Sequence, residues 1–317
     1  MPEYIIRSAP PESPEMLEII SYDQCQAHEI VELLRQDRVV MIKNLTPDRA
    51  DTLVSELADL LGLTESLELQ AGFAALYGHR KRIGKNLMTV NERSNYEFIT
   101  PHCEGDGISN IQFASFYCYG NSTDGGETIL MKIDEASPDL PILRELSTRI
   151  APGSKQLSIQ QAALAKALYR LRSPDDYLRA GDRILGQRKT EIPGLVLLTV
   201  LALPEKAYSR LLDKSLHPYW DTIASIDHSS AESFTHLLRQ NGLLKSGDAL
   251  QVTKKMDHTA KRRIWRSGVN HAALFSAKMT LKLSAGDFIA YNNLTWAHGV
   301  ANWTPGCGIR RLAAAFA

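Results

Sequence analysis

The sequence predicts a mainly β protein with flanking helices, because short apolar runs beside glycine-containing turns recur in both halves of the chain. These runs are 111–119, 124–131, 284–293 and 308–314. The chain has 317 residues, 44% of them hydrophobic, which is enough to bury a sizeable core. We therefore expect one elaborated domain over residues 1–317.

The first part of the chain is expected to form an arm, a helix, a strand and a second helix. Residues 1–22 are rich in Pro and Glu, which favours an extended arm. Apolar residues at helical spacing predict a helix over 27–36, and consecutive apolar residues predict a buried strand at 39–42. The next helix begins after Thr46, a suitable N-cap followed by proline, and Gly62 can end it.

The middle of the chain, 136–245, is expected to be a helical insertion between the two halves of the β core. Helical patterns cover 156–171 and 231–240, whereas 194–200 is typical of a strand. The insertion either covers the mouth of a site or buttresses the core from outside, and both roles remain open. The charged stretch 78–100 likewise either lines the mouth or forms a solvated loop.

His102 and Glu104 form a His-x-Glu pair, the most informative chemical feature of the chain. Side chains two residues apart on a strand point to one face, while Cys103 between them points away. If His298 returns to the same place in the fold, two imidazoles and one carboxylate form the facial set that leaves open positions on a non-haem Fe(II) ion. A His-x-Glu pair often arises by chance and is weak evidence for a metal site, so other motifs must support it.

Other residues compete for places in this set. Asp106 shares the same strand face, although the glycines on both sides of it suggest that the strand has already turned. His258 and His271 could replace His298, which is expected on the loop after the strand within 284–293.

Two further segments offer partners for a bound anion. Thr128 follows two glycines and opens a strand, so its hydroxyl can donate to a carboxylate, although a simple hairpin also explains it. Arg310 and Arg311 begin the terminal strand, where alternation turns at least one of them inward. An inward guanidinium needs an anion, and a planar dicarboxylate suits its fork.

The order of these motifs resembles the taurine dioxygenase family of Fe(II)/2-oxoglutarate oxygenases. The motifs are His102-x-Glu104, Gly125-Gly126-Glu127-Thr128, Gly286-Asp287, His298-Gly299 and Arg310. Glu in place of the commoner Asp is similar to the clavaminate synthase-like branch. The resemblance covers about 30–135 and 245–317 and leaves the middle uncovered. It implies a double-stranded β-helix, or jelly-roll, core.

The resemblance implies that His102, Glu104 and His298 are the iron ligands, and the motif order favours His298 over the other histidines. It also implies an O₂-dependent dioxygenase that converts 2-oxoglutarate into succinate and CO₂. The default outcome is hydroxylation of a small molecule, with an amino acid or a natural-product biosynthetic intermediate favoured. Because Glu104 stands where halogenating relatives need Gly or Ala, halogenation is not expected.

The resemblance further implies that Thr128 and either Arg310 or Arg311 hold the distal carboxylate of 2-oxoglutarate. Arg310 is favoured because Arg310-x-Leu312 matches the family's Arg-x-Leu pattern. Two departures are the residues after His298-Gly299 and four residues after Arg310, where this chain has Val and Ala instead of Arg. A substrate contact that some relatives make at the second of these positions is therefore in doubt.

Composition limits the remaining possibilities. Thirty-six basic and 36 acidic residues cancel, which argues against a general affinity for nucleic acid or anionic membranes. No apolar run is long enough to span a bilayer and the N-terminus lacks a signal-peptide pattern, so a cytoplasmic location is the default. Four cysteines without a Cys-x-x-Cys motif indicate neither a disulfide framework nor a zinc ribbon.

Two rival functions remain open. A cupin-like metal enzyme would share the jelly-roll and iron site but would have no use for Thr128 and an inward arginine. A non-catalytic jelly-roll binding module would have lost a ligand, whereas His102, Glu104 and His298 are all present.

Overall fold

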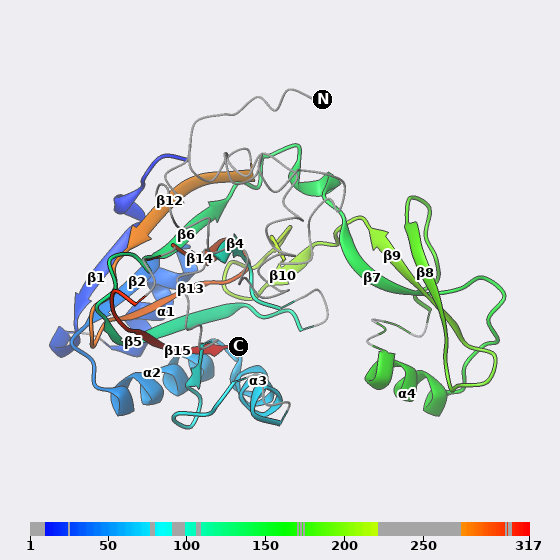
Figure 1. The fold of residues 1–317 in the computed structure, drawn as a ribbon, viewed down its shortest axis with the longest axis horizontal. Coiled ribbons are helices and arrows are strands. Elements are labelled where there is room, and N and C mark those ends of the chain that lie inside the picture. The colour runs from blue at the N-terminus through cyan, green and yellow to red at the C-terminus, as the bar shows by residue number, and fades with distance from the viewer. Residues whose placement is uncertain are drawn as a thin grey trace.

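The chain forms two main β-sheets with helices on one side (Figure 1), as the computed structural model shows. The structure describes residues 10–24, 26–76, 80–90, 99–105, 109–169, 171, 173, 175–220, 274–301, 303 and 306–317. The six-stranded sheet runs in the order β1 (Leu17–Ser21), β2 (Val39–Lys43), β13 (Phe288–Asn292), β5 (Phe113–Asn121), β15 (Arg310–Phe316) and β3 (Met88–Thr89). The four-stranded sheet runs in the order β12 (Phe275–Leu281), β6 (Thr128–Ile133), β14 (Trp296–Val300) and β4 (Ile99–His102).

The two sheets pack face to face through one apolar cluster. Phe116 on β5 and Tyr291 on β13 meet Leu130 on β6 and Trp296 on β14 in this cluster. Strand alternation explains the arrangement, because neighbouring residues of the same strands point to the opposite side. The prediction of a mainly β protein with flanking helices is therefore confirmed.

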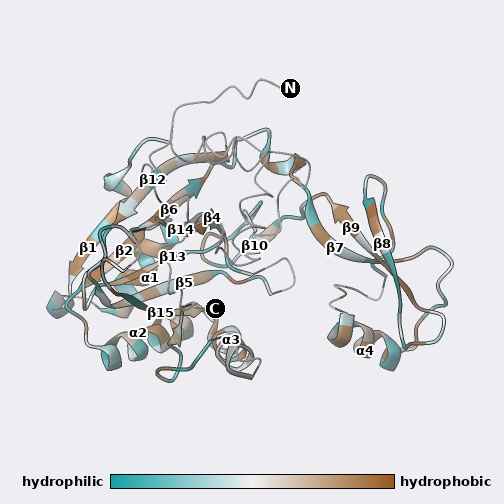
Figure 2. Ribbon diagram, in the orientation of Figure 1, coloured by the Kyte–Doolittle hydropathy of each residue, from teal (hydrophilic) through white to brown (hydrophobic). Residues whose placement is uncertain are grey.

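Helices cover the outer face of the six-stranded sheet. They are α1 (Ala27–Arg35), α2 (Pro47–Leu60) and α3 (Thr64–Leu76), of which the first two were predicted. Thr46 caps α2 by accepting a hydrogen bond from the Arg49 amide at 3.4 Å, and the φ of Gly62, +66°, suits the turn after the helix. In Figure 2, α2 carries both hydrophobic and hydrophilic colour, as a helix packed on a sheet should.

The prediction of an extended arm over 1–22 is only partly correct for the described portion, 10–22. Its last residues form β1, which pairs in parallel with β2 and so extends the six-stranded sheet. A Pro- and Glu-rich composition did not reveal this pairing, because the partner strand lies elsewhere in the chain. None of the described helices is long and apolar enough to cross a membrane.

The described part of 136–245 is not the helical insertion that the sequence predicts. A three-stranded sheet of β7 (Glu145–Ile150), β9 (Val196–Ala202) and β8 (Arg183–Lys189) lies apart from the two main sheets, with α4 (Ile159–Tyr169) beside it (Figure 1). The predicted helix at 156–171 and strand at 194–200 correspond to α4 and β9. The predicted helix at 231–240 lies outside the described residues.

A short hairpin, β10 (Ala207–Ser209) and β11 (Lys214–Leu216), follows this lobe. Leu216, Tyr219 and Trp220 then pack with Ile129, Met131 and Ala297 on the outer face of the four-stranded sheet. An apolar cluster thus lies on each face of that sheet, which fixes the register of the strands that carry the candidate site.

Candidate metal centre and its pocket

The two histidines of the candidate site lie directly opposite each other on adjacent strands. His298 on β14 is the register partner of His102 on β4, and their ring centroids are 4.5 Å apart. β14 is held in place on its other side by β6. His298 therefore stands on a strand and not on the loop expected from the sequence, because 296–300 completes the four-stranded sheet.

Glu104 follows the end of β4, in a bend that an asparagine holds. The Glu104 amide donates to Asn293 Oδ1 at 2.8 Å, and Asn293 Nδ2 donates to the carbonyls of Glu104 (3.0 Å) and Ile111 (2.7 Å). Asn293 is fully buried between β13 and β14. It thus ties the Glu104 bend to the turn that leads to His298, a role that the sequence analysis did not assign to it.

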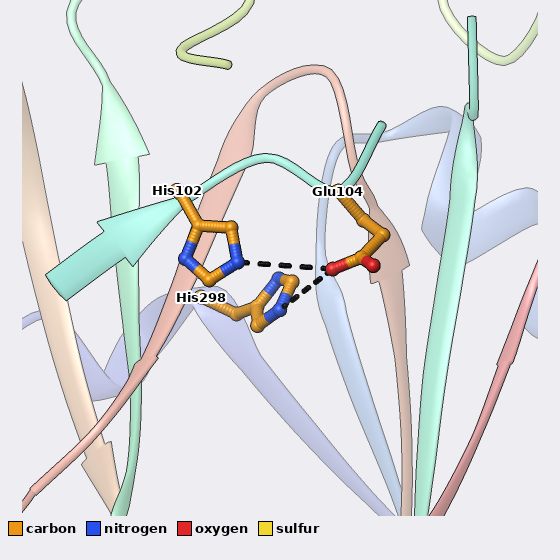
Figure 3. A group of neighbouring side chains, drawn as sticks. All are labelled: His102, Glu104 and His298. Atoms are coloured by element: carbon orange, nitrogen blue, oxygen red, sulfur yellow. Dashed lines mark ion pairs between the residues drawn. The ribbon is translucent and has the colours of Figure 1, made fainter. Parts of the chain in front are cut away.

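The three side chains point toward one another (Figure 3). Glu104 Oε2 is 3.7 Å from Nε2 of His102 and 3.7 Å from Nε2 of His298. One ligand atom from each residue lies within 4.8 Å of the others, so a single ion fits between them. Two imidazoles and one carboxylate are the donor set that suits a non-haem Fe(II) ion with open positions. The residues therefore fit the metal that the motif implies.

Arg80 holds the second oxygen of the same carboxylate. Its Nη2 donates to Glu104 Oε1 at 2.8 Å, and its Cζ lies 4.9 Å from the ring centroid of Phe316. Burial opposes ionisation of Glu104, but the charge of Arg80 and the two neighbouring histidines outweigh it, so the pKa of Glu104 is well below its usual range. The carboxylate is charged, with Oε1 engaged and Oε2 turned toward the imidazoles.

Thr128 and Arg310 meet on the wall next to this centre. Arg310 Nη2 donates to Thr128 Oγ1 at 3.4 Å, and its Nε donates to the Gly126 carbonyl at 2.9 Å. Burial lowers the pKa of Arg310 to about 10, the cost expected for a cation taken out of water. Arg311 is exposed instead, with its Cζ 5.2 Å from the Tyr119 ring centroid.

These groups line one cavity of about 620 Å³. His102, Glu104 and His298 form part of its wall, and Thr128 and Arg310 form another part. Apolar side chains complete it: Phe116, Val300, Trp303, Leu312 and Phe316. This volume is in the range of pockets that bind small molecules.

Of the other residues that the sequence analysis weighed for this site, the structure describes Cys103. Cys103 is buried on the other side of the sheet from His102, as alternation predicts, and burial raises the pKa of its thiol. Asp106, His258 and His271 lie outside the described residues.

No family model matches this chain, and no curated protein matches it. Among solved structures it is similar to a putative alpha-ketoglutarate-dependent taurine dioxygenase from Burkholderia xenovorans, with 12% identity, a TM-score of 0.43 and coverage of 98% of this chain and 91% of that one. It is also similar to AAD-2 in complex with Mn(II) and N-oxalylglycine, with 10% identity, a TM-score of 0.36 and coverage of 95% and 91%. The non-heme iron oxygenase OrfP with Fe and alpha-ketoglutaric acid matches with 13% identity, a TM-score of 0.39 and coverage of 92% and 78%. At these scores, the assignment of function rests on the side chains of this chain.

Proposed function

We propose that this protein is an Fe(II)/2-oxoglutarate-dependent dioxygenase that oxidises a small molecule, by default through hydroxylation, with release of succinate and CO₂. The observation that carries the proposal is the convergence of Glu104 Oε2 with the Nε2 atoms of His102 and His298. The paired Thr128 and Arg310 on the wall of the same cavity support the use of a dicarboxylate.

For the fold, we propose a single domain with a double-stranded β-helix core. The shared apolar cluster between the two main sheets supports this architecture. The lobe of β7, β8, β9 and α4 is then an insertion within 136–245 between the two halves of the core.

His102, Glu104 and His298 would hold the iron, which when bound supplies the oxidising chemistry with O₂. The direct pairing of His102 with His298 keeps the two imidazoles side by side. Arg80 retains Oε1 of Glu104, so Oε2 is the atom offered to the metal. The protein thus presents three donors to one point and leaves the remaining positions open.

Arg310 and Thr128 would bind the distal carboxylate of 2-oxoglutarate. The hydrogen bond from Arg310 Nε to the Gly126 carbonyl fixes the plane of the guanidinium. The Thr128 hydroxyl, which accepts from Arg310, can then donate its own hydrogen to the ligand. An anion here also offsets the cost of burying Arg310, and Phe116 and Leu312 exclude water from this wall.

Anaerobic titration with Fe(II) and then 2-oxoglutarate tests the proposal. We expect a weak visible charge-transfer band from chelated 2-oxo acid. The band should be absent in His298→Ala and present in the control His28→Ala, which removes an exposed histidine on α1. Bound iron without a band would instead favour a cupin-like enzyme that does not use 2-oxoglutarate. Failure to bind iron would favour a non-catalytic jelly-roll module.

A further inference from the structure

We propose that Lys282 is a positioning residue for 2-oxoglutarate, because its ammonium group holds the 121–126 loop against which Arg310 packs. Lys282 directly follows β12, and the loop connects β5 to β6. Lys282 is not among the residues that line the cavity, so it would act on the cosubstrate only through this loop. The inference rests on the proposed function and adds a residue outside the cavity to it.

The backbone on both sides of Lys282 is held in place. Leu281 is the register partner of Thr128 where β12 pairs with β6. Leu283 is fully buried in the apolar cluster between the two main sheets. The Lys282 side chain therefore starts from a defined point beside the strand that carries Thr128.

The ammonium group of Lys282 is surrounded by oxygens of the 121–126 loop. Its Nζ donates to the Thr123 carbonyl at 2.5 Å and to the Gly125 carbonyl. Asn121 Oδ1 and Thr123 Oγ1 each lie 3.3 Å from the same nitrogen. All four acceptors are neutral, and hydrogen bonds from a charged donor are stronger than those from a neutral one. Loss of the ammonium group would thus remove the strongest donor from two carbonyls of the loop at once.

The next carbonyl of the loop faces Arg310. The Gly126 carbonyl accepts from Arg310 Nε at 2.9 Å and from Asn121 Nδ2 at 3.1 Å. The φ of Gly126 is +68°, a conformation that glycine adopts without strain. This turn lets the Gly125 carbonyl bind Lys282 while the following carbonyl binds Arg310. The two cations therefore hold consecutive peptide groups of one loop.

The loop packs so closely on Arg310 that a movement of one must move the other. A Cβ added to Gly126 would lie 2.9 Å from Arg310 Cδ and 2.9 Å from Thr123 Oγ1. A shift of the Gly126 carbonyl would turn the guanidinium plane of Arg310, whose Nη2 donates to Thr128 Oγ1. Because a forked contact with a carboxylate depends on that plane, we expect the affinity for the distal carboxylate to depend on Lys282.

The test titrates the anaerobic, Fe(II)-loaded protein with two 2-oxo acids and follows the charge-transfer band. One is 2-oxoglutarate, and the other is 2-oxopentanoate, which has a methyl group in place of the distal carboxylate. In Lys282→Met the dissociation constant of 2-oxoglutarate should rise about three- to tenfold, the range for one weakened charge-assisted hydrogen bond. The constants of 2-oxopentanoate and of Fe(II) should not change.

The control Lys278→Met removes another lysine next to the same strand pair. Lys278 lies on β12, and its Nζ is 3.1 Å from Glu12 Oε1, so this variant should change neither 2-oxo acid constant. A double-mutant cycle then asks whether Lys282 acts through Arg310. In an Arg310→Ala background, Lys282→Met should raise the constant of 2-oxoglutarate no further.

The same titrations separate this inference from the proposed function. If the parent protein forms the band, the positioning role alone is overturned by any of three results: an unchanged 2-oxoglutarate constant in Lys282→Met, an equal loss of affinity for both 2-oxo acids, or additive effects in the cycle. Absence of the band in the parent protein overturns the proposed function and this role with it. A selective, non-additive loss of 2-oxoglutarate affinity supports both.

Discussion

Gly299 lies where the two histidine-bearing strands come closest, and replacing it with alanine should separate them. A Cβ at this position would lie 2.5 Å from the Ile99 carbonyl oxygen and 3.1 Å from the Pro101 nitrogen, both backbone atoms of β4. Because neither atom can rotate away, β14 and β4 must move apart. Raising 2.5 Å to an ordinary contact of 3.4 Å requires about 0.9 Å.

This displacement is large relative to the tolerance of a metal site. Ligands must be held within about 0.5 Å of their productive positions, and His298 immediately precedes Gly299. We expect Gly299→Ala to weaken Fe(II) binding about tenfold or more, as measured by anaerobic titration of the 2-oxoglutarate charge-transfer band. Overpacking against backbone should also reduce the free energy of unfolding by about 1–3 kcal/mol.

Gly120→Ala is the matched control. Gly120 lies on β5, and a Cβ added there meets no atom within 4 Å. This variant should keep the iron affinity and the thermal midpoint of the parent protein. Equal iron affinities and equal midpoints for Gly299→Ala and Gly120→Ala would refute the reasoning that close approach of β14 to β4 builds the site.

Three other substitutions test the remaining parts of the assignment. Glu104→Ala should abolish substrate-coupled 2-oxoglutarate turnover, measured as succinate release; undiminished turnover would remove Glu104 from the ligand set. Arg310→Ala should raise the KM for 2-oxoglutarate about ten- to hundredfold, the value of a lost charge-assisted contact, and more than Arg311→Ala does. The reverse ranking would move this role to Arg311. Asp51→Ala leaves three backbone amides without their acceptor and should lower the free energy of unfolding in urea by about 2 kcal/mol, whereas exposed Asp59→Ala should not.

The direction of a side chain could be predicted from the sequence wherever it follows from strand alternation. The side chains of His102 and Glu104 meet on one side while Cys103 is buried on the other, as a period of two requires. Alternation also separates Arg310, next to Thr128, from exposed Arg311. These relations depend only on neighbours in the chain, so a local pattern contains them.

Contacts between distant segments could not be predicted in this way. Arg80 was known only as part of a charged loop, and its bond to Glu104 depends on the 81–89 hairpin, which Asp51 and β15 hold in place. Asn293 stood in a turn motif, but its three hydrogen bonds require the Glu104 bend to return to it. The strands in the middle of the chain were likewise missed in part, because pairing with β9 stabilises the exposed β8.

The sequence by itself determined which side chains are available and which face of a strand each one takes, because side-chain direction follows from backbone geometry within a few residues. It also determined the cap of α2 and the apolar runs that became the strands of the core. Only the tertiary structure decided that His298 lies opposite His102 and that Arg80 reaches Glu104. Strand register and hairpin placement depend on burying apolar surface from segments far apart in the chain, a condition that no local pattern expresses.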